Sequence, residues 1–170
     1  VLRKMILLLC LLNIGRLYAQ SDEFCEAVNV ISRDAPDKFR NIRGRMTESN
    51  ANATMWASGI KVPGSIGSRF VASMGLFYEC AFIQTKDKNG LKEPYYMYKN
   101  YLTNCLVPFG YKLSEQPNFY PGLDAYKKLV FMQEIKEGTD PGNPPSHITL
   151  EATYHKDAGQ YTIVMFIFEH

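Results

Sequence analysis

The sequence predicts an α+β domain: an antiparallel sheet of about five strands with two main helices packed on one face. Three observations lead to this prediction. Apolar residues recur at helical spacing in two segments, strand-like segments outnumber those helices, and most of the strands arrive in hairpins. Hairpins favour an antiparallel sheet, because a short turn joins strands that run in opposite directions.

The first predicted helix covers residues 22–34. Ser21 can cap its free N–H groups, Asp22 and Glu23 suit the positive end of the helix dipole, and Pro36 closes the element. A second helix begins at Pro94, which is favoured at a first helical position, and ends before Pro108. Its predicted apolar face consists of Tyr95, Tyr98, Leu102 and Cys105.

The remaining elements are strands and loops. Residues 37–50 are basic and suit a short helix or a turn-rich segment. Strands are expected at residues 54–62, 69–84, 110–113, 126–134, 147–155 and 160–169. The last strand is apolar on both faces from Ile163 to Phe168, so it is expected to lie centrally in the sheet.

Residues 1–19 have the pattern of an export signal. Two cations, Arg3 and Lys4, precede a short apolar run that ends near Ile14, and Ala19 offers a small residue for cleavage. The run is shorter than the roughly 20 residues that span a bilayer, so no permanent membrane anchor is expected. This predicts a signal peptide over residues 1–19, a single domain over residues 20–170, and a periplasmic or secreted location.

Charge argues against a nucleic-acid partner. The 19 basic residues less Arg3, Lys4 and Arg16 leave 16 basic against 17 acidic residues in the predicted mature chain. A phosphate backbone is bound chiefly by clustered positive charge, which this near-neutral domain lacks.

Three cysteines remain after the predicted cleavage: Cys25, Cys80 and Cys105. An exported chain can keep disulfides, and an odd count leaves at least one thiol unpaired. Cys80 and Cys105 both fall on apolar faces that point to a shared core, so this pair is the predicted disulfide. The sequence holds no C-x-x-C spacing, which disfavours a redox pair or a zinc knuckle.

One constellation suggests a metal, but its geometry argues against it. His147, Glu151 and His155 share one face of a predicted strand, and imidazole and carboxylate are usual zinc ligands. At about 3.3 Å per residue, strand residues four apart are roughly 13 Å apart, so they cannot converge on one ion. We therefore predict no metal and no cofactor.

Aromatic side chains are the more plausible functional signal, since amphipathic rings serve binding surfaces well. Tyr96 and Tyr101 lie on the second predicted helix, and Phe119 and Tyr120 lie in a loop; we predict that all four contact a ligand or partner. The alternative is that these side chains only pack against loops, while Tyr95 and Tyr98 belong to the core. Arg40 and Arg43, in the basic segment, are candidate anion contacts, although a solvated basic face also explains them.

Several local features resemble small exported proteins of unknown function from Bacteroidetes. The residues that carry this resemblance are Ala19-Gln20, Phe24-Cys25, Phe39, Ile42-Arg43-Gly44, Trp56, Val62-Pro63-Gly64 and Tyr78. The resemblance implies export but brings no activity and no functional residues. The order of helix, strands, helix and strands is also similar to that of type III secretion chaperones, whose cytosolic role conflicts with an export signal.

The sequence favours an exported, non-enzymatic interaction module that binds a protein partner through its sheet face or its aromatic helix. One alternative is a small-molecule or glycan-binding protein, with the loop from Phe119 to Pro121 and the Pro- and Gly-rich loop at residues 136–146 beside a cleft. Another is a small hydrolase whose site is not recognisable from the sequence. A flat apolar patch favours the first, a pocket with convergent polar groups the second, and perturbed titrating groups in a cleft the third.

Overall fold

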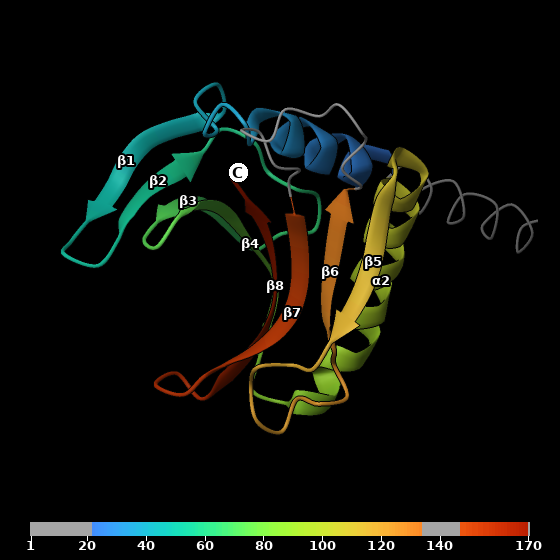
Figure 1. The fold of residues 1–170 in the computed structure, drawn as a ribbon. Helices are drawn as coiled ribbons and strands as arrows, with labels where there is room; N and C mark the ends of the chain where they lie inside the picture. Colours follow the sequence, from blue (N-terminus) through green and yellow to red (C-terminus); the bar gives the residue numbers. More distant parts are fainter. Residues whose placement is uncertain (1–21, 134–146, 170) are drawn as a thin grey trace, which may run out of the picture.

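The computed structural model describes residues 22–133 and 147–169, which form one antiparallel sheet of eight strands with two α-helices (Figure 1). The first helix covers residues 22–34, and α2 covers Lys92–Leu106. Short 3-10 segments flank α2: η1 (Lys88–Leu91) and η2 (Val107–Phe109). The strands are β1 (Arg43–Ser49), β2 (Thr54–Ser58), β3 (Gly67–Ala72), β4 (Leu76–Thr85), β5 (Tyr111–Gln116), β6 (Lys128–Gln133), β7 (His147–His155) and β8 (Gln160–Phe168).

The chain builds the sheet as two similar halves. Each half is a helix followed by four strands in order, and the strands lie in the order β1-β2-β3-β4-β8-β7-β6-β5. The last strand of each half therefore pairs with the other at the centre, where Phe77 lies opposite Phe168 and Cys80 opposite Met165. This pairing makes one continuous sheet from two meanders.

The core lies between the helices and the outer face of the curved sheet. Phe24 of the first helix contacts Phe82 of β4 at a ring distance of 5.9 Å and Tyr101 of α2 at 5.4 Å. Tyr98 of α2 stacks on Phe82 at 3.9 Å. These rings join both helices to the middle of the sheet, and their burial from water supplies much of the driving force for folding.

The predicted fold class is wrong. The sheet has eight strands instead of about five, and it dominates a molecule with only two α-helices in its described part. The helices leave β1 uncovered, since six of its seven residues are exposed. Two hairpins account for the difference. The basic segment forms β1 instead of a helix, and residues 69–84 divide into β3 and β4 at a turn around Met74.

Other elements match their predictions. The first helix spans residues 22–34 as expected, and β7 and β8 form the predicted hairpin. The central place predicted for residues 160–169 is confirmed, since β8 lies between β4 and β7. Apolar residues on both faces favour a position with neighbouring strands on either side, which is why this strand could be placed from its sequence.

The predicted Cys80–Cys105 disulfide is also wrong. Cys105 of α2 bonds to Cys25 of the first helix, with the two Cα atoms 5.1 Å apart, and Cys80 is a buried free thiol. Both partners of the observed bond come from helices, which also meet through the rings of Phe24 and Tyr101. The sequence pattern placed Cys105 and Cys80 in one core but could not show which cysteine faced which.

The predicted signal peptide at residues 1–19 lies outside the described residues. Within the described part of the chain, no helix has both the length and the apolar character needed to cross a membrane.

Candidate functional site

The concave face of the sheet is the candidate site. Figure 1 shows a strongly curved sheet whose outer side carries both helices, while the β1–β2 hairpin and the β7–β8 turn project on the inner side. Because side chains alternate along a strand, each strand supplies every second residue to this inner face. A register shift between Ala81 and Ile83 of β4 marks a bulge, and bulges bend and twist strands.

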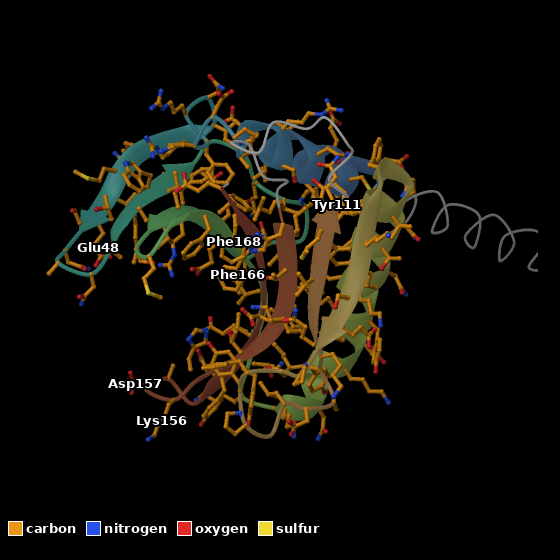
Figure 2. The ribbon with its side chains drawn as sticks, viewed as in Figure 1. Glu48, Tyr111, Lys156, Asp157, Phe166 and Phe168 are labelled. Atoms are coloured by element: carbon orange, nitrogen blue, oxygen red, sulfur yellow. A yellow bond between two sulfur atoms is a disulfide. The ribbon has the colours of Figure 1, made fainter. Side chains whose placement is uncertain are left out.

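An aromatic row lies at the centre of the concave face. It consists of Phe77 of β4, Phe166 and Phe168 of β8, and His147 of β7. Phe77 is 5.6 Å from both Phe166 and Phe168, and the His147 ring stacks on Phe168 at 4.2 Å. Figure 2 shows Phe166 and Phe168 on the inner side of the sheet, away from the helices. All four side chains are partly exposed.

Small buried side chains form the floor around this row. Val71, Val130 and Val164 are each at most 6% exposed, yet they do not belong to the helix-facing core cluster. Thr149 and Thr162 are 1% and 4% exposed, and their hydroxyl oxygens have no hydrogen-bond partner among the described residues. A buried hydroxyl without a hydrogen-bond partner lowers the stability of the folded state. The concave face therefore contains two groups that destabilise the fold.

A cavity of about 560 Å³, which we name the loop pocket, lies where the β5–β6 loop meets the concave face. Its lining includes Gln116, Asn118, Phe119, Tyr120, Lys128 and Glu151. The strand residues converge by register, since Gln116 pairs with Lys128 across β5 and β6. Lys128 in turn lies beside Glu151 of β7, with its Nζ atom 3.8 Å from the carboxylate.

Asn118 holds the loop that closes this pocket. Its side-chain amide donates to the backbone carbonyls of Tyr126 and Ala152, and its side-chain oxygen accepts from the backbone N–H of Tyr120. These three bonds tie the loop both to itself and to β7. The loop is therefore held in place by hydrogen bonds within the protein itself.

Glu151 is the most unusual charged group of the concave face. It is only 9% exposed, and its burial raises the pKa of its carboxyl group, an effect that Lys128 partly offsets. Burial also raises the pKa of the nearby Tyr120 hydroxyl, and the negative charges of Glu151 and Glu79 add to this shift. The loop tyrosine thus stands in the field of two carboxylates from the sheet.

A second cavity, of about 400 Å³, lies over β3 and β4 and is lined in part by Arg69, Glu79 and Gln84. Arg69 and Glu79 form an ion pair at 2.9 Å, which neutralises both charges. The concave face therefore combines an apolar centre with paired charges on either side.

Two of the predicted aromatic residues come together in the structure. Phe119 and Tyr120 both line the loop pocket, with their rings 5.8 Å apart, and Phe119 is 84% exposed. The other two stay apart on α2. Tyr96 is 46% exposed, whereas Tyr101 is partly buried against Phe24.

The two predicted arginines lie away from the loop pocket. Arg40 is exposed in the turn before β1. The Arg43 guanidinium lies 4.5 Å from the centre of the Trp56 ring, in a cation–π contact that helps to hold β1 on β2.

Two kinds of chemistry are considered next: metal binding and a cysteine nucleophile. Among the described residues, no group of three or more His, Cys, Asp or Glu side chains could hold a metal ion. His155 instead contacts the Thr153 hydroxyl at 3.3 Å. Burial raises the pKa of the Cys80 thiol to about 12, so this cysteine is protonated at neutral pH and poorly suited to act as a nucleophile.

Sequence reasoning missed the aromatic row and the Lys128–Glu151 pair as parts of a site. Phe166 and Phe168 were recognised only as apolar residues of a central strand. Lys128 and Glu151 are 23 positions apart, and only the register of β6 on β7 brings them together. The alternation along β8 could have located the aromatic row in the sequence. Phe166 and Phe168 fall on the face of β8 opposite its core residues.

No protein-family model, curated protein or solved structure matches this chain.

Proposed function

We propose that this protein is an exported, non-enzymatic binding module that recognises a protein partner through the concave face of its sheet. The observation that carries this proposal is the partly exposed aromatic row at the centre of that face, on the side that neither helix covers. Exposed aromatic clusters on a rigid scaffold are typical of interaction surfaces.

The shape of the face suits a protruding element of a partner. The sheet curves around the aromatic row, and the β1–β2 hairpin and the β7–β8 turn extend on the same side (Figure 1). Figure 2 shows Glu48 on the first of these projections, and Lys156 and Asp157 at the tip of the second. A loop or hairpin of a partner would therefore meet an apolar centre and a polar rim, which is the usual composition of protein interfaces.

Charge further restricts the partner. Arg69 and Glu79 are already paired, and Lys128 lies beside Glu151, so this arrangement offsets the four charges on either side of the aromatic row. It favours a partner that inserts apolar side chains flanked by neutral hydrogen-bonding groups.

Export is part of this proposal. The Cys25–Cys105 disulfide supports it, because such bonds persist mainly in oxidising compartments. The signal-like pattern of residues 1–19 supports it independently.

The test begins with cross-linking capture from the envelope and medium of the host, followed by direct binding measurements with each purified candidate partner. The test variant is Phe166→Ala/Phe168→Ala, and the control is Tyr96→Ala, which changes an exposed ring of α2, a helix on the outer side of the sheet. Loss of a hot-spot aromatic side chain typically costs about 2 kcal/mol or more, so we expect binding to weaken roughly thirtyfold in the test variant and to persist in the control.

Two outcomes would contradict the proposal. Binding that survives in the double variant but is lost in Tyr96→Ala would move the interaction surface to α2. A folded wild-type protein that binds none of the captured candidates directly would remove the case for a protein partner.

A further inference from the structure

We propose that the loop pocket binds a neutral saccharide of one or two pyranose units. This site is separate from the aromatic row and does not depend on the protein-binding role proposed above. The inference rests on the polar groups of the pocket, the balance of their charges, the exposed phenylalanine at its rim and its size.

The polar groups of the loop pocket retain hydrogen-bonding capacity. The 3.8 Å separation of Lys128 Nζ from the Glu151 carboxylate exceeds the usual hydrogen-bond range of about 2.7–3.2 Å. The Gln116 side chain is exposed and forms no hydrogen bond with another described residue. The pocket thus presents an ammonium donor, a carboxylate acceptor and an amide that can do either.

The charges in the pocket favour a neutral ligand. Lys128 and Glu151 lie close enough to offset each other, so an anion would meet Glu151 and a cation would meet Lys128. A vicinal diol suits this pair better, because each hydroxyl can donate to the carboxylate or accept from the ammonium. Adjacent hydroxyls of a pyranose can bridge the two groups without bringing a net charge.

Phe119 supplies the apolar part of the site. Its ring is 84% exposed although a buried position would be favourable for it, and its contact with Tyr120 is edge-on. A ring face is therefore open beside the polar groups. Pyranose rings carry C–H groups on one face that pack against aromatic rings while their hydroxyls point sideways to hydrogen-bonding partners.

The size and rigidity of the pocket agree with this ligand class. Its volume of about 560 Å³ lies within the roughly 300–1,000 Å³ typical of small-molecule sites. Asn118 fixes the loop that carries Phe119 and Tyr120 through its bonds to Tyr126, Ala152 and Tyr120. Weakly binding saccharides benefit from such a preformed site, since little affinity is lost to ordering the protein.

The experiment measures binding of neutral mono- and disaccharides to the full chain, produced in an exporting host. Glucose, galactose, mannose, N-acetylglucosamine and their common disaccharides are screened by saturation-transfer NMR, and the ligands that bind are titrated by calorimetry. Zwitterionic amino acids and inorganic phosphate are screened in parallel. We expect at least one saccharide to bind and the charged ligands not to bind.

Pocket variants then locate the site. Removing a hydrogen bond to a charged group costs about tenfold or more in affinity, so Glu151→Gln is expected to weaken saccharide binding by at least that factor. Phe119→Ala is expected to have a similar effect. Both side chains can be changed with little risk to folding, because Phe119 is exposed and glutamine keeps the shape of Glu151.

Two controls keep this result distinct from the protein-binding proposal. Met74→Ala changes a fully exposed side chain on the β3–β4 turn, and Phe166→Ala/Phe168→Ala changes the aromatic row. Both variants are expected to bind saccharide as the wild type does. The inference is overturned if no saccharide binds, if only amino acids or phosphate bind, or if Phe119→Ala and Glu151→Gln leave saccharide affinity unchanged.

Discussion

The two faces of the sheet differ in what their residues do for stability. The outer face packs against the helices through large apolar side chains that are fully buried, such as Phe70 and Phe131. The inner face keeps phenylalanines partly exposed, buries a carboxylate and leaves threonine hydroxyls without partners in the described structure. Proteins tolerate such costs where a surface serves another purpose, so the comparison points to the concave face as the functional one.

The largest expected change in unfolding free energy comes from replacing a buried phenylalanine of the core, and it is compared with the same replacement on the concave face. Phe24→Ala removes a fully buried ring that contacts Phe82 and Tyr101, and such core truncations cost about 3–5 kcal/mol of unfolding free energy. Phe166→Ala removes a partly exposed ring, so we expect a loss of about 1–2 kcal/mol. Urea denaturation of both variants measures the difference. Equal losses would mean that the aromatic row is structural.

The next effect concerns the disulfide between the two helices. Cys25 and Cys105 are 80 residues apart, and closing a loop of that length restricts the unfolded chain. We expect Cys25→Ala/Cys105→Ala to lower the unfolding free energy by about 2–4 kcal/mol. Adding a thiol reductant should destabilise the wild type and leave the double variant unchanged. A reductant effect that persists in the double variant would contradict the assigned pairing.

The secondary-structure elements differ in how well the sequence predicts them. The first helix could be predicted because its cap, periodicity and terminating proline agree locally. β8 could be placed centrally because it is apolar on both faces. In contrast, apolar and other side chains alternate almost continuously over residues 69–84, including the turn around Met74. The two-residue period of a strand therefore did not mark the end of β3.

The candidate site could be predicted only in part. Phe119 and Tyr120 could be chosen from sequence because exposed aromatics in a loop are unusual enough to suggest binding. Lys128 and Glu151 could not, because their meeting depends on strand order and register, which are set by contacts far apart in the chain. The cysteine pairing failed for the same reason, since it depends on how the two helices lie against each other.

A smaller effect tests the unpartnered hydroxyls of the concave floor. Thr149→Val replaces a hydroxyl that has no partner among the described residues, and we expect it to raise the unfolding free energy by about 1 kcal/mol. Thr153→Val is the matched control on the same strand. Its hydroxyl contacts His155 Nε2 at 3.3 Å and the Thr162 carbonyl at 3.4 Å, so its loss should destabilise by a similar amount. Destabilisation by both substitutions would show that Thr149 has a partner in solution.

The last prediction concerns the pH dependence caused by Glu151. Burial raises the pKa of this carboxyl group in the folded state, so the folded protein holds the proton more tightly than the unfolded chain. The contribution of Glu151 to the unfolding free energy therefore falls as pH rises from the ordinary glutamate pKa of about 4.3 through the raised folded pKa. Glu151→Gln removes the ionisation, and we expect it to be more stable than the wild type at neutral pH, with an advantage that shrinks as pH falls through that window.

Lys128 supplies the control for this titration. Its positive charge lowers the pKa of Glu151, so Lys128→Met should raise that pKa further and extend the pH-dependent loss of stability to higher pH. Thermal denaturation from pH 4 to pH 8 distinguishes the three proteins. Parallel stability curves for the wild type and Glu151→Gln would mean that the carboxylate is well solvated, and the polar half of the loop pocket would then resemble ordinary surface. Divergent curves would identify a carboxylate that is kept on the concave face at a cost to folding, as the comparison of the two faces requires.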